Sequence, residues 1–288
     1  MTRRVAVAAA LALFVWLLLP VGRAYLLVAA RRSDPGPPGE MSVEQASFAS
    51  TDGVALDGWL VRAGERAPAV VLVHGFKTSR AEMLPWARFL HDAGYNVLLF
   101  DTRGCGRSAG LTVGVGATEP RDISGAVSLA ETVFDTPKVA VLGISLGAGA
   151  AILAGANDSR IVAVVADSAW TDQDLQLSRL SFVPLGRLEL PLLPFGVAAA
   201  SAMVGTDVTR VRPIEAIARI APRRVFLIHS ADDENATTPV AGAEALFAAA
   251  SEPKELWVAP HGGHVGAINA FGAEYRSRVL AFLAKAFL

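Results

Sequence analysis

Short apolar runs alternate with helix-length segments through most of this chain, and this alternation is the feature that most constrains its fold. The runs occupy residues 69–74, 96–100, 139–144, 161–165, 225–229 and 255–258. Nearly continuous apolar runs of this length are typical of parallel strands that are buried on both faces of a sheet. The helix-length segments are 79–94, 120–134, 146–156, 239–250 and 267–286. Repeated strand–helix units predict a mostly parallel sheet covered by helices on both faces.

Two further features complete the predicted domain, which spans residues 43–288. Residues 43–62 read as two alternating strands joined by Asp52-Gly53, a hairpin signal, which brings the sheet to eight strands. Residues 170–212 break the strand–helix rhythm and contain Pro184, Pro191 and Pro194. A segment this long without strand character is typical of a small helical lid inserted in the domain. An ordinary helical connector is the alternative.

The first 32 residues differ from the rest of the chain and predict a transmembrane anchor. Residues 5–22 contain no charged side chain, and a helix over 5–30 would measure about 39 Å, which exceeds a bilayer core of about 30 Å. Residues 33–42, which include the stretch SDPGPPGE, predict a Pro/Gly linker. A cleaved signal peptide and a buried core helix are the alternatives, but Arg23 and the long apolar total favour an uncleaved anchor.

Charge and cysteine content exclude several classes of protein. Residues 1–32 carry five arginines and no acid, whereas the remainder carries 21 basic and 27 acidic residues. A body without a basic stripe argues against nucleic-acid binding. The single cysteine, Cys105, excludes a disulfide scaffold. Arginines flank the apolar helix at both ends, so the positive-inside rule counts nearly equal charge on the two sides of the membrane. We expect a single-pass protein of the cell membrane with its body outside the cytoplasm.

The stretch Gly143-Ile144-Ser145-Leu146-Gly147 fits the pattern G-x-S-x-G and carries the chemistry. It follows a predicted buried strand and begins a predicted helix of small residues, which is the context that a nucleophile elbow requires. Small residues on either side allow the tight turn, which exposes the serine oxygen at the end of the sheet. The helix N-terminus behind it favours developing negative charge. We therefore predict that Ser145 is a nucleophile.

A serine nucleophile needs a base, which is expected on the loop between the last strand and the final helix. His261 and His264 qualify, and we select His264 because it directly precedes the helix and follows two glycines. The remaining histidines, His74, His91 and His229, lie at strand ends or on a helix.

The base in turn needs an orienting carboxylate after the penultimate strand. Asp233 is the first choice there, with Asp232 and Glu234 as alternatives. The order serine, aspartate, histidine is the order expected for this topology.

The sequence also suggests how a developing oxyanion would be held. One donor is the backbone amide of Leu146, directly after the nucleophile, and the other is the amide of Phe76, with Gly75 permitting close approach. No HxxE motif, cysteine pair or nucleotide-binding motif is present, so we expect neither a metal nor a cofactor. Cys105 is interpreted as a packed turn residue.

These motifs together resemble those of serine hydrolases of the α/β-hydrolase superfamily, in the serine-aminopeptidase-like and acylglycerol-lipase-like branch. The matching segments are VLVHGF (71–76), GYNVLLFDTRGCGRS (94–108), GISLG (143–147), VRPIEAIARIAPRRVFLIHSADD (211–233) and GGHVGA (262–267). The chain departs from the family at Ser230, where glycine is usual. It departs again at Pro239, which lies two residues further from Asp233 than is usual, so the loop that carries the carboxylate is longer.

The sequence thus predicts a membrane-anchored serine hydrolase that cleaves carboxylic esters through Ser145, His264 and Asp233 and an acyl-enzyme. The apolar segment 170–212 and the adjacent membrane favour a small-molecule substrate with an apolar acyl group. A serine peptidase or amidase of the same fold is one alternative. A non-catalytic membrane protein with an α/β-hydrolase fold is the other. The sequence makes no prediction of oligomeric state.

Overall fold

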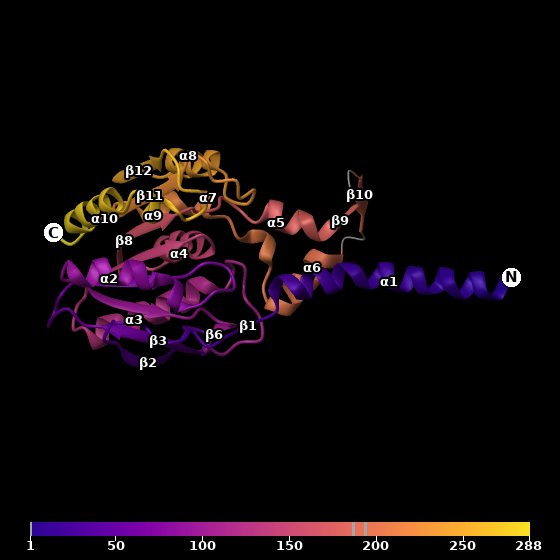
Figure 1. The fold of residues 1–288 in the computed structure, drawn as a ribbon, viewed down its shortest axis with the longest axis horizontal. Coiled ribbons are helices and arrows are strands. Elements are labelled where there is room, and N and C mark those ends of the chain that lie inside the picture. The colour runs from indigo at the N-terminus through magenta and orange to yellow at the C-terminus, as the bar shows by residue number, and fades with distance from the viewer. Residues whose placement is uncertain (1, 186–187, 193–194) are drawn as a thin grey trace.

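The computed structural model describes residues 2–185, 188–192 and 195–288, and an eight-stranded sheet forms its centre (Figure 1). The strand order is β12-β11-β8-β7-β4-β5-β3-β2. Within this sheet β2–β3 and β3–β5 pair antiparallel, and the other neighbouring strands pair parallel. The strands are β2 (Glu44–Ala49), β3 (Ala55–Val61), β4 (Ala69–Val73), β5 (Asn96–Phe100), β7 (Val139–Ile144), β8 (Ile161–Asp167), β11 (Arg224–Ser230) and β12 (Lys254–Ala259). The predicted mostly parallel sheet of eight strands is confirmed.

Helices cover both faces of this sheet because the central strands are apolar on both sides. One face packs against α3 (Glu119–Val133), α4 (Leu146–Asn157), α7 (Pro213–Ala216), η4 (Ile217–Ile220) and α8 (Val240–Ala249). The opposite face packs against η1 (Arg80–Met83), α2 (Leu84–Asp92), α9 (Ala267–Ala270) and α10 (Gly272–Ala286). The two buried apolar layers hold the carboxyl ends of the parallel strands in register, and the site lies at that edge.

Two predicted segments differ in detail from the structure. The helix expected over 267–286 is divided at Phe271, which leaves the helical conformation (φ −126°, ψ 37°). Its ring then packs against Trp257 and His261, at centroid distances of 6.1 and 4.7 Å. The helix predicted over 239–250 begins one residue later, because Pro239 precedes α8 as its N-cap.

The segment expected to form a lid contains short helices and a hairpin. It comprises α5 (Asp174–Ser178), η2 (Arg179–Ser181), β9 (Phe182–Leu185), β10 (Leu188–Pro191), α6 (Phe195–Val204) and η3 (Val208–Arg210). The sequence pattern did not predict the antiparallel β9–β10 pair. The exposed β10 residues lack the buried apolar face by which strands are normally recognised.

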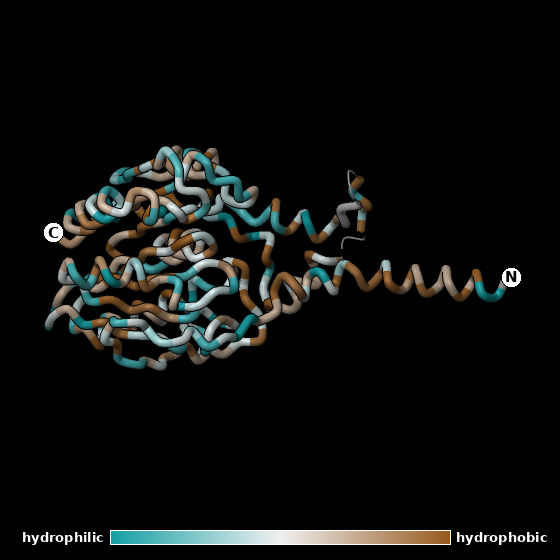
Figure 2. The backbone as a smooth tube through the Cα atoms, viewed as in Figure 1, coloured by the Kyte–Doolittle hydropathy of each residue, from teal (hydrophilic) through white to brown (hydrophobic). Residues whose placement is uncertain are grey.

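The N-terminal helix α1 (Thr2–Val28) extends away from the body along most of its length (Figure 1). Its span 3–28 has a mean hydropathy of 2.5, and apolar residues follow one another along it (Figure 2). Such a helix can be a membrane anchor or a signal sequence. Its last turns contact α6, and Ala24 and Val28 are fully buried there. The short strand β1 (Arg31–Arg32) then pairs with β6 (Cys105–Gly106).

Candidate active site

Ser145 occupies a sharp turn between β7 and α4 at the carboxyl edge of the sheet. Its backbone is in an uncommon conformation for a residue with a side chain (φ 52°, ψ −117°). The turn is possible because its neighbours are glycines: a Cβ on Gly143 would lie 2.2 Å from the Gly147 oxygen, and one on Gly147 would lie 2.5 Å from the Val73 oxygen. The sequence G-x-S-x-G therefore forms the strained elbow that exposes a serine hydroxyl.

The structure brings the three predicted site residues into one hydrogen-bonded chain. The Ser145 Oγ atom lies 2.9 Å from Nε2 of His264, and Nδ1 of the same ring lies 2.9 Å from Oδ2 of Asp233. Because a carboxylate only accepts hydrogen bonds, Nδ1 carries the proton and Nε2 accepts from the serine hydroxyl. This is the arrangement in which an imidazole can remove a proton from the serine.

Several groups besides His264 hold the Asp233 carboxylate. The buried His229 ring donates from Nε2 to the Thr238 carbonyl at 2.9 Å, and the same atom lies 3.2 Å from Asp233 Oδ2. The Asn235 amide donates to the other carboxylate oxygen at 2.9 Å. Burial disfavours the charged carboxylate, but hydrogen bonds from His229, His264 and Asn235 outweigh it and hold the pKa of Asp233 well below its ordinary value. The carboxylate is therefore ionised at neutral pH.

The alternative residues considered in the sequence lie elsewhere. Asp232 accepts a hydrogen bond of 2.8 Å from the Gly263 amide, which lowers the pKa of its carboxyl group and ties its turn to the His264 loop. His261 packs its ring against Phe271. Glu234 is exposed. Among the candidate carboxylates, only that of Asp233 contacts His264 within the part of the chain that the structure describes.

The two predicted oxyanion donors flank Ser145. Leu146 is the first residue of α4, so its amide has no acceptor within the helix. Gly75 lies directly beside the nucleophile, and a Cβ built on it would be 3.6 Å from Ser145 Cβ. The Gly75 amide donates to Glu82 at 2.9 Å, which fixes the loop and leaves the next amide, that of Phe76, without an acceptor among the described residues.

A buried polar network behind the site was not predicted from the sequence. The Asp167 carboxylate accepts hydrogen bonds from Tyr275 at 2.9 Å and from Ser168 at 3.0 Å. Ser168 in turn accepts from the Val265 amide at 3.1 Å, directly after His264. Burial raises the pKa of Asp167 to about 6. An Asp-Ser pair at the end of an apolar strand was the available signal, since polar residues at that edge face the site.

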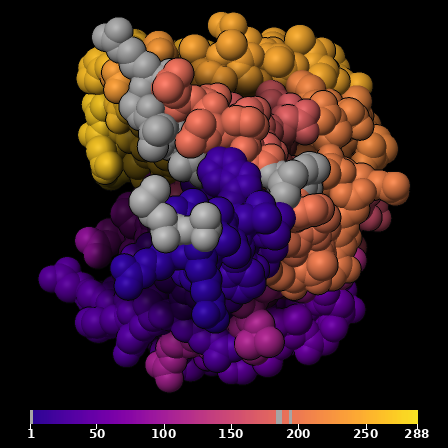
Figure 3. Space-filling model, turned by 90° about the vertical axis from the view of Figure 1, so that its right-hand side faces the viewer, coloured from indigo at the N-terminus to yellow at the C-terminus, as the bar shows by residue number. Residues whose placement is uncertain are grey.

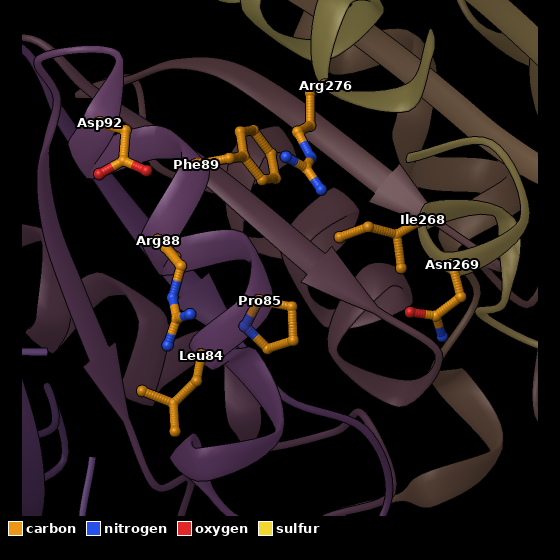
Figure 4. Close-up of a pocket in the computed structure, with 8 residues that line it drawn as sticks. All are labelled: Leu84, Pro85, Arg88, Phe89, Asp92, Ile268, Asn269 and Arg276. Atoms are coloured by element: carbon orange, nitrogen blue, oxygen red, sulfur yellow. The ribbon is translucent and has the colours of Figure 1, made fainter. Parts of the chain in front are cut away.

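A cavity of about 200 Å³ opens beside Ser145 and is enclosed in part by the lid. Its apolar side comprises Phe76, Val115, Leu146 and Trp170, and its polar side comprises Gln173, Gln176, Arg179, Asn235, Thr237 and Thr238. A second cavity, of about 370 Å³, lies between α2 and the C-terminal helices (Figure 4). None of its lining residues is a serine, cysteine or histidine, and it shares no residue with the cavity at Ser145.

Two other kinds of catalytic site, a metal centre and a cysteine nucleophile, were sought among the residues that the structure describes. No group of three or more His, Cys, Asp or Glu side chains is arranged to hold a metal ion within the described ranges. Cys105 is buried, and this burial raises the pKa of its thiol to about 12. Its thiol is therefore protonated at neutral pH and a poor nucleophile.

Comparison with known proteins agrees with this fold. Residues 64–195 match the family described as "Serine aminopeptidase, S33". A Bacillus subtilis protein named YqkD is 29% identical over 246 residues, covering 84% of this chain and 80% of the relative. The structure of an esterase from Pyrococcus furiosus superposes with a TM-score of 0.74 at 26% identity, covering 90% of this chain and 99% of that one. A thiohydrolase of Arthrinium phaeospermum is 34% identical over 134 residues, covering 43% of this chain and 42% of the relative.

The fold, the elbow and these matches define the class. The chain belongs to the α/β-hydrolase superfamily and is a hydrolase.

Proposed function

We propose that this protein is a membrane-anchored serine hydrolase that cleaves carboxylic esters through Ser145, His264 and Asp233. The observation that carries the proposal is the hydrogen-bonded chain from Asp233 through His264 to Ser145, with both links at 2.9 Å, at a strained elbow beside a cavity. α1 is the proposed anchor, because it is long, apolar and mostly exposed.

The reaction follows from the positions of these groups. His264 Nε2 takes the hydroxyl proton as Ser145 Oγ attacks the ester carbonyl carbon. The carbonyl oxygen becomes an oxyanion, which accepts hydrogen bonds from the Phe76 and Leu146 amides. The protonated imidazole, stabilised by the Asp233 carboxylate, then gives its proton to the departing alkoxide. Water, deprotonated by the same imidazole, attacks the acyl-enzyme and frees the acid and Ser145.

A serine aminopeptidase is a second candidate, because the matching family carries that description. An aminopeptidase has to hold the α-ammonium group of its substrate, which calls for a carboxylate in the cavity. The residues that line the cavity at Ser145 include no acid among those the structure describes, and they include the cationic Arg179. This lining favours an uncharged ester over a peptide N-terminus, and the name of the Pyrococcus furiosus relative favours it as well.

Reaction with a fluorophosphonate probe tests the nucleophile. We expect the full chain to be labelled, Ser145→Ala to lose labelling, and Ser128→Ala to keep it, since Ser128 is exposed on α3 and its hydroxyl bonds to Ser124 and Arg160 rather than to a histidine. Failure of the folded wild-type protein to react would overturn the proposal. A panel of acyl esters and aminoacyl amides then separates the two candidates, and the ester assignment fails if amides are turned over faster.

A further inference from the structure

We infer that the lid face around the β9–β10 hairpin rests on the same bilayer that α1 crosses, and that the substrate is an ester lipid that reaches Ser145 from that bilayer. This inference rests on the proposed function and names its substrate class. The surface involved is the lid face, which we define as Leu188 and Leu190 on β10 together with Phe195 at the start of α6. Figure 3 looks along α1 onto this side of the molecule, where elements of the lid lie beside the helix.

The part of α1 that makes no contact with the body is too short to cross a bilayer by itself. Pro20 is the first buried residue of the helix, and its carbonyl lies near α6, 3.3 Å from a Cβ built on Gly196. The apolar residues that precede it, 5–19, span about 22 Å, whereas a bilayer core is about 30 Å thick. Roughly the last 8 Å of the apolar layer must therefore surround the part of α1 that already contacts the lid. The start of α6 and the hairpin beside it would then lie at the boundary between the apolar layer and the headgroups.

The exposed side chains of the lid face fit that depth. Leu188 is 66% exposed and Phe195 is 49% exposed, and Leu190, which points to the same side of the strand pair as Leu188, is also exposed. Large apolar side chains exposed in this way mark a site of interaction with an apolar partner. Glu189, on the same strand, is exposed as well, which fits contact at headgroup depth rather than in the hydrocarbon.

Continuous apolar packing connects this level of the molecule to the cavity at Ser145. Phe76 and Val115 line the cavity and also belong to the apolar cluster that buries Ala24 and Val28 of α1. Arg179 lines the cavity from η2, and its carbonyl accepts a hydrogen bond of 2.6 Å from Arg23 on α1. η2, which covers the nucleophile, is therefore directly followed in the chain by the strand pair of the lid face. An acyl chain leaving the bilayer would follow apolar surface toward Ser145.

Fluorescence at two positions tests the docking. Leu188→Cys and Leu288→Cys in the full chain each provide one reactive thiol, because Cys105 is buried and its raised pKa keeps it protonated. Leu288 is the matched control, since it is 99% exposed and lies at the opposite end of the molecule from the free end of α1 (Figure 1). Each variant is labelled with a nitrobenzoxadiazole dye and reconstituted into phosphatidylcholine–phosphatidylglycerol vesicles.

We expect the dye at position 188 to be blue-shifted and quenched by lipids that carry a spin label near the headgroup, and the dye at position 288 to be unaffected. Equal quenching at the two positions would overturn the inference. A blue shift at position 188 that persists in lipid-free detergent together with a dimer would also overturn it, because a second copy of the chain would then cover the lid face.

Substrate delivery is tested with Leu188→Glu and its control Leu288→Glu. A charge on the lid face should lower kcat/KM about tenfold for a long-chain ester embedded in vesicles, because contact of the leucine with the bilayer is lost. The same variant should hydrolyse a water-soluble short-chain ester at the wild-type rate. An equal loss with both esters would overturn the inference. Failure of the proposed function is separable, because it abolishes probe labelling of the wild type and leaves the quenching at position 188 intact.

Discussion

The elbow at Ser145 depends on glycine at position 147, where a side chain would collide with backbone. A Cβ there would lie 2.5 Å from the Val73 oxygen and 2.6 Å from the His74 oxygen, and neither atom can move without distorting the sheet. We expect Gly147→Ala to destabilise the protein by several kcal/mol, about the range of severe core overpacking. Gly242→Ala, on α8, is the control. The added Cβ would lie 3.4 Å from the Thr171 side chain, which is an ordinary van der Waals distance. Thermal unfolding should show this control to be slightly more stable than wild type.

Asp233 acts on the reaction through His264, so its removal should lower kcat much more than it weakens substrate binding. Replacing it with asparagine keeps the shape but loses the negative charge that selects the ring tautomer and stabilises the imidazolium. We expect Asp233→Asn to lower kcat by about 10⁴-fold with little change in KM. Asp232→Asn should lower kcat less than tenfold, since Asp232 bonds to the Gly263 amide. Steady-state kinetics that give similar losses for both variants would contradict the assignment.

Asp167 gives the protein a specific pH dependence. Burial raises its pKa to about 6, whereas an unfolded aspartate titrates near about 4. Between these values the native state keeps a proton that the unfolded state has lost, so stability falls as pH rises through this window. We expect wild-type protein to lose about 2–3 kcal/mol relative to Asp167→Asn between pH 4 and pH 7. Denaturation midpoints in detergent provide the measurement, and a difference independent of pH would refute it.

At the scale of elements, the C-terminal end of α1 contacts the loop that carries a proposed oxyanion donor. Lys77, directly after Phe76, donates from Nζ to the Leu26 carbonyl at 2.7 Å. Loss of a hydrogen bond of this kind is worth about 1–1.5 kcal/mol, which corresponds to as much as a tenfold change in rate. We therefore expect Lys77→Met to lower kcat with a soluble ester by up to tenfold.

Lys138 provides the matched control for this prediction. Its Nζ atom donates to the Phe287 carbonyl at 2.7 Å near the end of α10, so it makes the same kind of bond away from Ser145. Lys138→Met should retain wild-type kcat. If both variants lose activity equally, the coupling between α1 and the Phe76 loop is refuted.

The sequence predicts those elements whose environment is uniform along their length. Parallel strands such as β4 are buried on both faces, so their apolar runs were recognisable. The β9–β10 hairpin was missed because its exposed residues carry no such pattern. The position of Ser145 follows from a local motif. The buried polar network could not be predicted in this way, because Asp167 and Ser168 form it with Tyr275 and Val265, which are about a hundred residues away in the chain. The bond from Lys77 to Leu26 likewise depends on the docking of α1.

At the scale of the whole molecule, the proposed anchor makes a direct prediction about the mature protein. If α1 spans the bilayer and is retained, the full chain should remain with membranes after extraction with alkaline carbonate. Its N-terminal peptide should also be recovered from the mature protein by mass spectrometry. The free apolar stretch of α1 supplies far more burial than one acyl chain, so this association should be effectively irreversible. Release into the supernatant of a chain that begins after residue 28 would instead identify a cleaved signal sequence.

The residues that join α1 to the body are held by hydrogen bonds to the body from the end of the helix onward. α1 ends at Val28, Ala29 bridges to Thr112, the Ala30 amide donates to the Leu111 carbonyl, and β1 then pairs with β6. With α1 in a bilayer, Ser145 would stand at one fixed height above it. Such an enzyme would work in cis: mixed with a second population of vesicles, it would consume ester lipids in its own membrane and leave those in neighbouring membranes intact.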